Sequence, residues 1–172
     1  DSDIYYKKDL FKSMIDLIDN NKRYGMITPN TQQNVSDKFG LNRSTSYYDS
    51  WALKDLKSNQ GLSFAYNPFI INSDRCSWNK CIPISVSSAF GGIALLRGDL
   101  LQEKKLIWNG ALGCEHWFFC EKVRELNFSI IVHPLLLAEV RHSKPVRPDL
   151  FLLIFDKLRL MQNSLRKNNL FY

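Results

Sequence analysis

Apolar side chains recur every three or four residues in three segments of the chain, which is the spacing of one helix face. The segments are residues 10–20, residues 115–126 and the stretch after Pro148. Asp9 stands where the first helix would begin, and aspartate is a favoured N-cap residue. We therefore predict three helices, with a further helical turn at Gly98.

Short apolar runs bounded by turn residues predict strands between these helices. They lie at residues 24–28, 84–86, 93–96, 129–132 and 135–140. Pro29 and Pro134 are expected to end the first and fourth runs. Residues 29–46 are polar and predict a long loop, residues 47–56 fit a strand or a short helix, and residues 67–83 look irregular. Helices and strands alternate, so we expect an α/β fold with a mixed sheet flanked by helices.

The length and the net charge of the chain restrict its possible architecture and partners. The chain has 172 residues, enough for one well-packed domain, and no apolar run approaches the roughly 18 residues that span a bilayer. We expect a cytoplasmic protein. The net charge of +6 suits anionic partners such as nucleotide diphosphates, nucleic acid or acidic lipids, and it does not choose among them.

The last predicted helix divides the chain into residues 1–148, the main unit, and residues 149–172, a helix packed on it. Its apolar stripe comprises Phe151, Ile154, Phe155, Leu158, Met161 and Leu165, and its basic residues are Lys157, Arg159, Arg166 and Lys167. Such a helix can lie on an anionic membrane surface or pack on its own domain, and we expect the second.

The four cysteines predict free thiols, most of them buried. They are Cys76, Cys81, Cys114 and Cys120, with four and five residues between the members of each pair. This spacing differs from the two-residue spacing of zinc knuckles, and a domain of this size does not depend on disulfides.

Two aspartates one residue apart, Asp1 and Asp3, open the chain. Carboxylate oxygens are the ligands that Mg²⁺ and Mn²⁺ prefer, and the end of a strand can present two of them together. Such triplets are also common on solvated surfaces. His142 becomes a candidate third ligand if the fold brings it to Asp3.

Two further motifs are candidates for a site. Gly91 and Gly92 lie between apolar residues and predict a tight turn, a β-bulge or close approach of a ligand. Glu115, His116 and Trp117 lie at a predicted helix start. Glu115 could accept a proton from a hydroxyl group, and a tryptophan face can stack on a sugar ring. An acidic residue at this position can also serve only to complement the helix dipole.

The order of these motifs resembles nucleotide-sugar glycosyltransferases of the glycosyltransferase-A fold, closest to a branch found in large DNA viruses, microbes and fungi. The resemblance covers residues 1 to about 142 and is carried by DSDIYY, YYDSWAL, SSAFGGIALLR, GCEHWFFCEKVRELNFSIIVHPLL and RH. It implies that Asp1, Asp3 and His142 hold Mn²⁺ or Mg²⁺ and that Glu115 is the catalytic base. The residues expected to contact substrate are Asp49, Trp51, Gly91, Gly92, His116 and Trp117.

The resemblance also implies what the chain is part of. It would form the C-terminal, acceptor-side portion of a Rossmann-like fold, and the nucleotide-binding half would precede Asp1. The expected reaction transfers a hexose or deoxyhexose from a nucleoside-diphosphate sugar to the hydroxyl of a glycan or another acceptor, with inversion. Such a fragment can be inactive by itself, and no nucleic-acid partner is expected. A nucleotidyltransferase and a non-catalytic carbohydrate- or partner-binding module remain alternatives.

Overall fold

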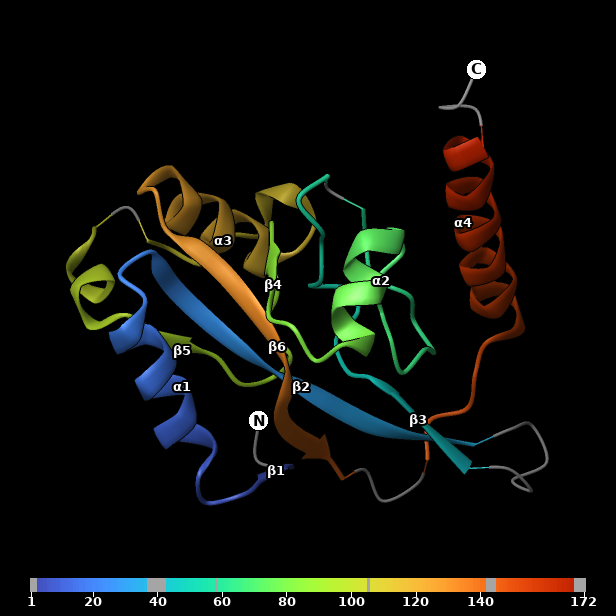
Figure 1. The fold of residues 1–172 in the computed structure, drawn as a ribbon, viewed down its shortest axis with the longest axis horizontal. Coiled ribbons are helices and arrows are strands. Elements are labelled where there is room, and N and C mark those ends of the chain that lie inside the picture. The colour runs from blue at the N-terminus through green and yellow to red at the C-terminus, as the bar shows by residue number, and fades with distance from the viewer. Residues whose placement is uncertain (1–2, 37–42, 58, 105, 142–144, 169–172) are drawn as a thin grey trace.

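The computed structural model describes residues 3–36, 43–57, 59–104, 106–141 and 145–168. Within these ranges the strands form one six-stranded sheet in the order β1-β6-β2-β3, with β4 added to β6 and β5 added to β2 (Figure 1). The strands are β1 (Ile4–Tyr6), β2 (Tyr24–Ser36), β3 (Arg43–Tyr47), β4 (Ile84–Val86), β5 (Leu95–Leu96) and β6 (Ser129–Val140). The helices are α1 (Leu10–Asn20), α2 (Asn72–Asn79), α3 (Glu115–Glu125) and α4 (Leu150–Asn168), with 3-10 helices at Gly98–Gln102 and Gly110–Leu112.

The two longest strands, β2 and β6, are parallel, and the other strand pairs are antiparallel. The expectation of an α/β fold with a mixed sheet flanked by helices is therefore confirmed. The more specific assignment to a glycosyltransferase-A fold stays a prediction. The helices at residues 10–20, 115–125 and 150–168 and the strand at residues 84–86 also lie where they were expected.

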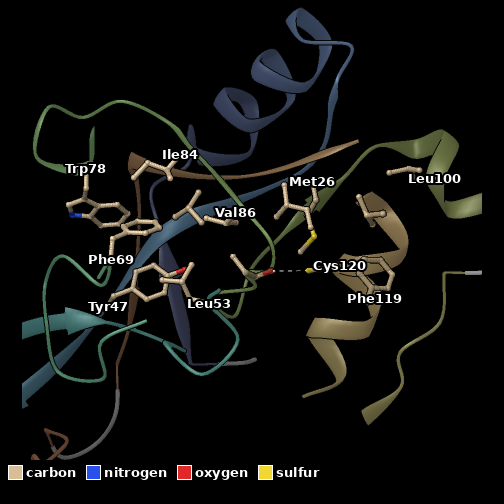
Figure 2. Close-up of a cluster of buried hydrophobic side chains, with 14 residues drawn as sticks. Met26, Tyr47, Leu53, Phe69, Trp78, Ile84, Val86, Leu100, Phe119 and Cys120 are labelled. Carbon is tan, nitrogen blue, oxygen red and sulfur yellow. Dashed lines mark hydrogen bonds between the residues drawn. The ribbon is translucent and has the colours of Figure 1, made fainter. Parts of the chain in front are cut away.

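Alternating side chains of the central strands build a core on each face of the sheet. Ile130 and Val132 belong to one buried cluster with side chains of α2 and α3, including Trp78 and Phe119 (Figure 2). Ile131 belongs to a second cluster, with Leu10, Met14 and Ile18 of α1. In Figure 1, α3 and α1 accordingly lie on opposite sides of the two long strands.

Two prolines were expected to end strands, and both expectations are wrong. β2 continues through Pro29 to Ser36, and β6 continues through Pro134 to Val140. The carbonyl of Pro29 faces Gly91, on the edge between the parts of β2 that pair with β5 and with β3. Because the N–H and C=O of one strand residue point the same way, an N–H at position 29 would point away from β6. Its absence in proline therefore removes no hydrogen bond between β2 and β6.

Pro134 lies in a matching irregularity of β6. The register with β2 moves from Pro29–His133 directly to Asn30–Leu137, so residues 134–136 bulge out of the ladder. The amide of Asn30 donates to the Pro134 carbonyl at 3.1 Å and holds this bulge. A proline at a bulge removes no ladder hydrogen bond.

The predicted loop at 29–46 is wrong for residues 29–36, which belong to β2, and for residues 43–46, which belong to β3. Residues 37–42 lie outside the described part of the chain. The stretch at 67–83 was expected to be irregular, yet it contains α2. Only Trp78 of this short polar helix is buried, so it has no apolar periodicity to predict it.

All four cysteines are free thiols, as expected. The expectation that most of them are buried is only half confirmed, because Cys114 and Cys120 are buried while Cys76 and Cys81 are exposed. Asp9 stands at the start of α1, although its side chain makes no capping hydrogen bond there. Among the residues that the structure describes, no helix is both long enough and apolar enough to cross a membrane.

The last helix, α4, contacts the rest of the molecule through polar side chains. The carboxylate of Asp156 accepts hydrogen bonds from the backbone N–H groups of Ser63 and Phe64, at 2.9 and 3.3 Å. Arg159 donates to the carbonyl of Gly61 at 3.1 Å, and Asn163 donates to that of Ile70 at 2.7 Å. The helix thus contacts the domain through polar side chains, and its apolar stripe remains exposed.

Candidate functional site

Four segments that are far apart in the sequence meet beside the N-terminal end of α3. The backbone N–H of Gly91 donates to the carboxylate of Asp49, and the indole N–H of Trp117 donates to the carbonyl of Trp51 at 3.1 Å. The side chain of Ile4 packs over Gly92. The structure therefore brings together three of the predicted motifs and the segment that carries Asp3.

Asp49 is the most perturbed acidic group of this site. It has a φ of +58°, in the left-handed region that aspartate tolerates better than most residues. Burial raises its pKa from 3.8 to about 6, and the negative charge of Glu115 adds to the increase. Hydrogen bonds from the backbone N–H groups of Ala52 and Gly91 oppose it. A carboxyl group with such a pKa can exchange protons near neutral pH.

Gly91 and Gly92 form a tight turn, one of the alternatives that the sequence left open. Their φ values are +63° and +73°, which only glycine adopts without strain. A Cβ atom at Gly92 would overlap the side chain of Ile4 and lie 3.2 Å from Tyr48 Cε1. The close approach at Gly92 is thus made by protein side chains, so Gly92 lies beneath Ile4 and Tyr48.

Gly91 lies close to two polar side chains of β2 and β3. A Cβ atom at this position would lie 3.3 Å from the Tyr47 hydroxyl and 3.4 Å from Thr31 Oγ1. Thr31 is fully buried, and its hydroxyl has no hydrogen-bond partner among the described residues. Gly91 thus packs against the buried polar side chains of these two strands.

Two tryptophans form an aromatic platform at the mouth of the site. The rings of Trp51 and Trp117 stack with centroids 5.6 Å apart and an interplanar angle of 28°. The ammonium group of Lys54 lies 3.4 Å from the centroid of the Trp117 ring. Trp117 is therefore engaged by protein groups, while Trp51 is 59% exposed and offers ring surface to a ligand.

Glu115 and His116 differ in their access to solvent. The side chain of Glu115 is exposed, and one of its oxygens lies 3.6 Å from His116 Nε2. The imidazole stacks on Phe90 at 4.2 Å and meets the edge of Trp108 at 5.1 Å. Burial lowers the pKa of His116, which favours the neutral form of the ring. Glu115 can thus reach a substrate, whereas His116 is largely enclosed by aromatic rings.

Two clefts border this region. One has a volume of about 460 Å³ and is lined by Asp49, Trp51 and Gln33 together with Leu152 and Arg159 of α4. The other has a volume of about 440 Å³ and extends along β1, β2, β3 and β6. Gln33 lines both clefts, so they adjoin each other at β2.

Of the predicted metal ligands, Asp3 lies within the described residues, next to Arg141, which lines the second cleft. The backbone N–H of Arg141 donates to the carbonyl of Asp3 at 3.0 Å, which continues the pairing of β1 with β6. Asp1 and His142 lie outside the described residues. In the ranges that the structure describes, no three His, Cys, Asp or Glu side chains gather as a metal site would require. Of the expected ligand set, Asp3 supplies one oxygen donor suited to Mg²⁺ or Mn²⁺.

Sequence reasoning missed several contributors. The site also contains Ile4, Tyr48 and Lys54. Each contacts a residue distant in the chain, and no local sequence pattern predicts these contacts. The turn at Asp49 did have a signal. An aspartate whose carboxylate accepts from the N–H three residues later, here Ala52 at 3.4 Å, is a common turn pattern.

Comparison with models of known protein families finds no match to this chain, and comparison with curated proteins finds none. The resemblance noted from the sequence therefore stays a prediction.

Proposed function

We propose that this chain carries the acceptor-side catalytic groups of a metal-dependent glycosyltransferase that uses a nucleoside-diphosphate sugar. The observation that supports the proposal is the convergence of Asp49, Gly91 and Glu115, which come from three separate motifs. A transferase needs an accessible carboxylate beside a surface that can hold a sugar. Glu115 and the exposed ring of Trp51 offer these two features close together.

In the proposed reaction, Glu115 accepts the proton of the acceptor hydroxyl while that oxygen attacks the anomeric carbon of the donor. The bond from the anomeric carbon to the diphosphate oxygen breaks, and the diphosphate leaves with the electron pair. Trp51 stacks on a sugar ring, and Asp49 holds the turn at Gly91 through its backbone hydrogen bond. Mn²⁺ or Mg²⁺ held by Asp3, with Asp1 and His142, would supply positive charge for the leaving diphosphate.

The test is sugar transfer by the full-length protein, measured with a panel of nucleoside-diphosphate sugars and with Mn²⁺ or Mg²⁺ present. Glu115→Gln is expected to reduce kcat by about 100-fold or more, because a general base contributes roughly that much. Glu121→Gln is the matched control, since Glu121 is an exposed glutamate on the same helix. If Glu115→Gln transfers sugar at the wild-type rate, Glu115 is not the base.

One observation favours a second candidate, a carbohydrate-binding module without catalysis. The exposed ring of Trp51 is sufficient for stacking on a sugar and needs neither a base nor a metal. Glycan binding that persists in a chelator and in Asp3→Ala, with no transfer by the wild-type protein, would favour this module. Binding that is lost in Trp51→Ala under the same conditions would locate it on the platform.

A further inference from the structure

The apolar stripe of α4 forms a continuous exposed face. Phe151, Leu158 and Leu165 are 67%, 48% and 61% exposed, and Ile154, Phe155 and Met161 are exposed beside them. The side of the helix opposite this face carries Asp156 and Asn163, which bond to the body. The polar contacts therefore fix the rotation of α4 so that the stripe faces away from the domain.

Basic residues outnumber acidic residues along this helix. Residues 150–168 contain four basic residues and one acidic residue, a net charge of +3, which is half of the +6 of the whole chain. The acidic residue is Asp156, which is buried and turned toward the body. Lys157 and Arg166 are both exposed, on either flank of the stripe.

We propose that α4 docks this protein on an anionic lipid surface, with the apolar stripe in the membrane interface and Lys157 and Arg166 against the headgroups. An amphipathic helix with an apolar face and a basic rim binds in this way, because burial of apolar area and attraction to anionic lipids add together. The proposal is independent of the sugar-transfer reaction. In this proposal, α4 binds a lipid surface in addition to its own domain.

Charge complementarity distinguishes a lipid surface from a second copy of the chain. Two copies that met through this face would bring together two helices that each carry a net charge of +3. Within residues 150–168 the acidic residue is Asp156, which already bonds to Ser63 and Phe64, so the exposed Asp149 before the helix offsets only part of this charge. A surface of anionic headgroups meets the same rim with the opposite sign.

The position of α4 also allows docking. The helix stands at one end of the molecule, and the body lies to one side of it (Figure 1). Because the exposed stripe is opposite the contacts with Gly61 and Ile70, a flat surface can meet it without displacing the helix. Docking therefore needs no rearrangement of the fold.

The experiment is flotation of the 172-residue chain with vesicles of phosphatidylcholine alone or with about one third phosphatidylserine. Binding to the anionic vesicles is expected to be at least tenfold stronger and to weaken as salt is raised. Each basic residue near such a surface contributes roughly fivefold, so Lys157→Gln with Arg166→Gln should lose about thirtyfold. Phe151→Ser with Leu158→Ser should also abolish flotation.

Lys8→Gln with Lys22→Gln is the matched control, because it removes the same charge from exposed positions outside α4. This pair should keep most of the binding, and circular dichroism should show every variant folded. Equal losses in both charge pairs would overturn the proposal in favour of a general effect of net charge. Absence of flotation by the wild type would also overturn it, and a dimer in sedimentation that Phe151→Ser with Leu158→Ser dissociates would assign the face to a second copy.

Discussion

The first and last helices, α1 and α4, have similar sequence patterns and opposite roles. Both carry apolar residues at helical spacing. In α1 the side chains of Leu10, Met14 and Ile18 are buried against the sheet. In α4 the corresponding stripe is exposed, and polar side chains make the contact with the body. The difference teaches that apolar periodicity predicts a helix and its apolar face, but not what that face will contact.

The largest loss of stability is expected at the centre of α1, the helix whose apolar face is buried. Met14→Ala should reduce the free energy of unfolding by about 2–5 kcal/mol, because Met14 is fully buried and the truncation leaves a cavity. Urea denaturation at pH 7 measures this. A loss below about 1 kcal/mol would mean that α1 is not part of the cooperative core.

Asp49 lies on the body side of the cleft that separates the body from α4. Replacing its carboxyl group should increase the free energy of unfolding, whereas Met14→Ala reduces it. Its pKa in the folded state, about 6, lies above 3.8, so it favours folding below about pH 4, and this contribution is lost as the pH rises through about 6. Asp49→Asn does not titrate, and it should therefore be more stable than wild type at pH 7.5, by about 2 kcal/mol after allowance for partial exposure.

The difference between Asp49→Asn and wild type should disappear near pH 4, where the wild-type carboxyl is protonated. Asp16→Asn is the control, because Asp16 is exposed on α1. Greater stability together with lower sugar transfer would be the mark of a residue kept for function. A stability difference that does not change with pH would contradict the raised pKa.

The polar attachment of α4 predicts a smaller loss. Asp156→Ala leaves the backbone N–H groups of Ser63 and Phe64 without their acceptor, which should cost about 1–3 kcal/mol. Hydrogen exchange should show α4 opening faster than α1 in this variant. Asp16→Ala, at an exposed position of α1, should stay within about 0.5 kcal/mol of wild type.

The smallest effect is expected on the exposed face of α4. Leu158→Ala should change the free energy of unfolding by less than about 0.5 kcal/mol in the absence of lipid, since nothing in the described structure packs on this side chain closely enough to bury it. The matched comparison is Met14→Ala. A comparable loss in both variants would erase the distinction between the helices and show that another surface covers the stripe in solution.

Much of the fold could be predicted from local sequence pattern. Three helices and the strand at residues 84–86 follow from apolar spacing and turn residues. Pro29 and Pro134 misled the prediction because their tolerance depends on neighbouring strands: each lies where the ladder is interrupted. That interruption is a property of pairing between β2 and β6, and neither segment reveals it alone.

The candidate site shows the same division. Asp49, Gly91 and Glu115 stand out as separate motifs, and their polar or conformational character is visible in the sequence. Their meeting point depends on the folded sheet, and so do the contacts of Ile4 with Gly92 and of Lys54 with Trp117. The raised pKa of Asp49 arises from burial and from the charge of Glu115, which only the tertiary structure supplies.

One wall of the cleft beside Asp49 and Trp51 is formed by Leu152 and Arg159 of α4. A ligand in this cleft would touch the same helix whose outer face meets the proposed lipid surface. If lipid binding shifts α4 and thereby changes the affinity of the cleft for its ligand, ligand binding must change the affinity for lipid by the same factor, because the coupling between two binding equilibria is reciprocal. Cleft occupancy and surface attachment would then be thermodynamically linked through a single helix.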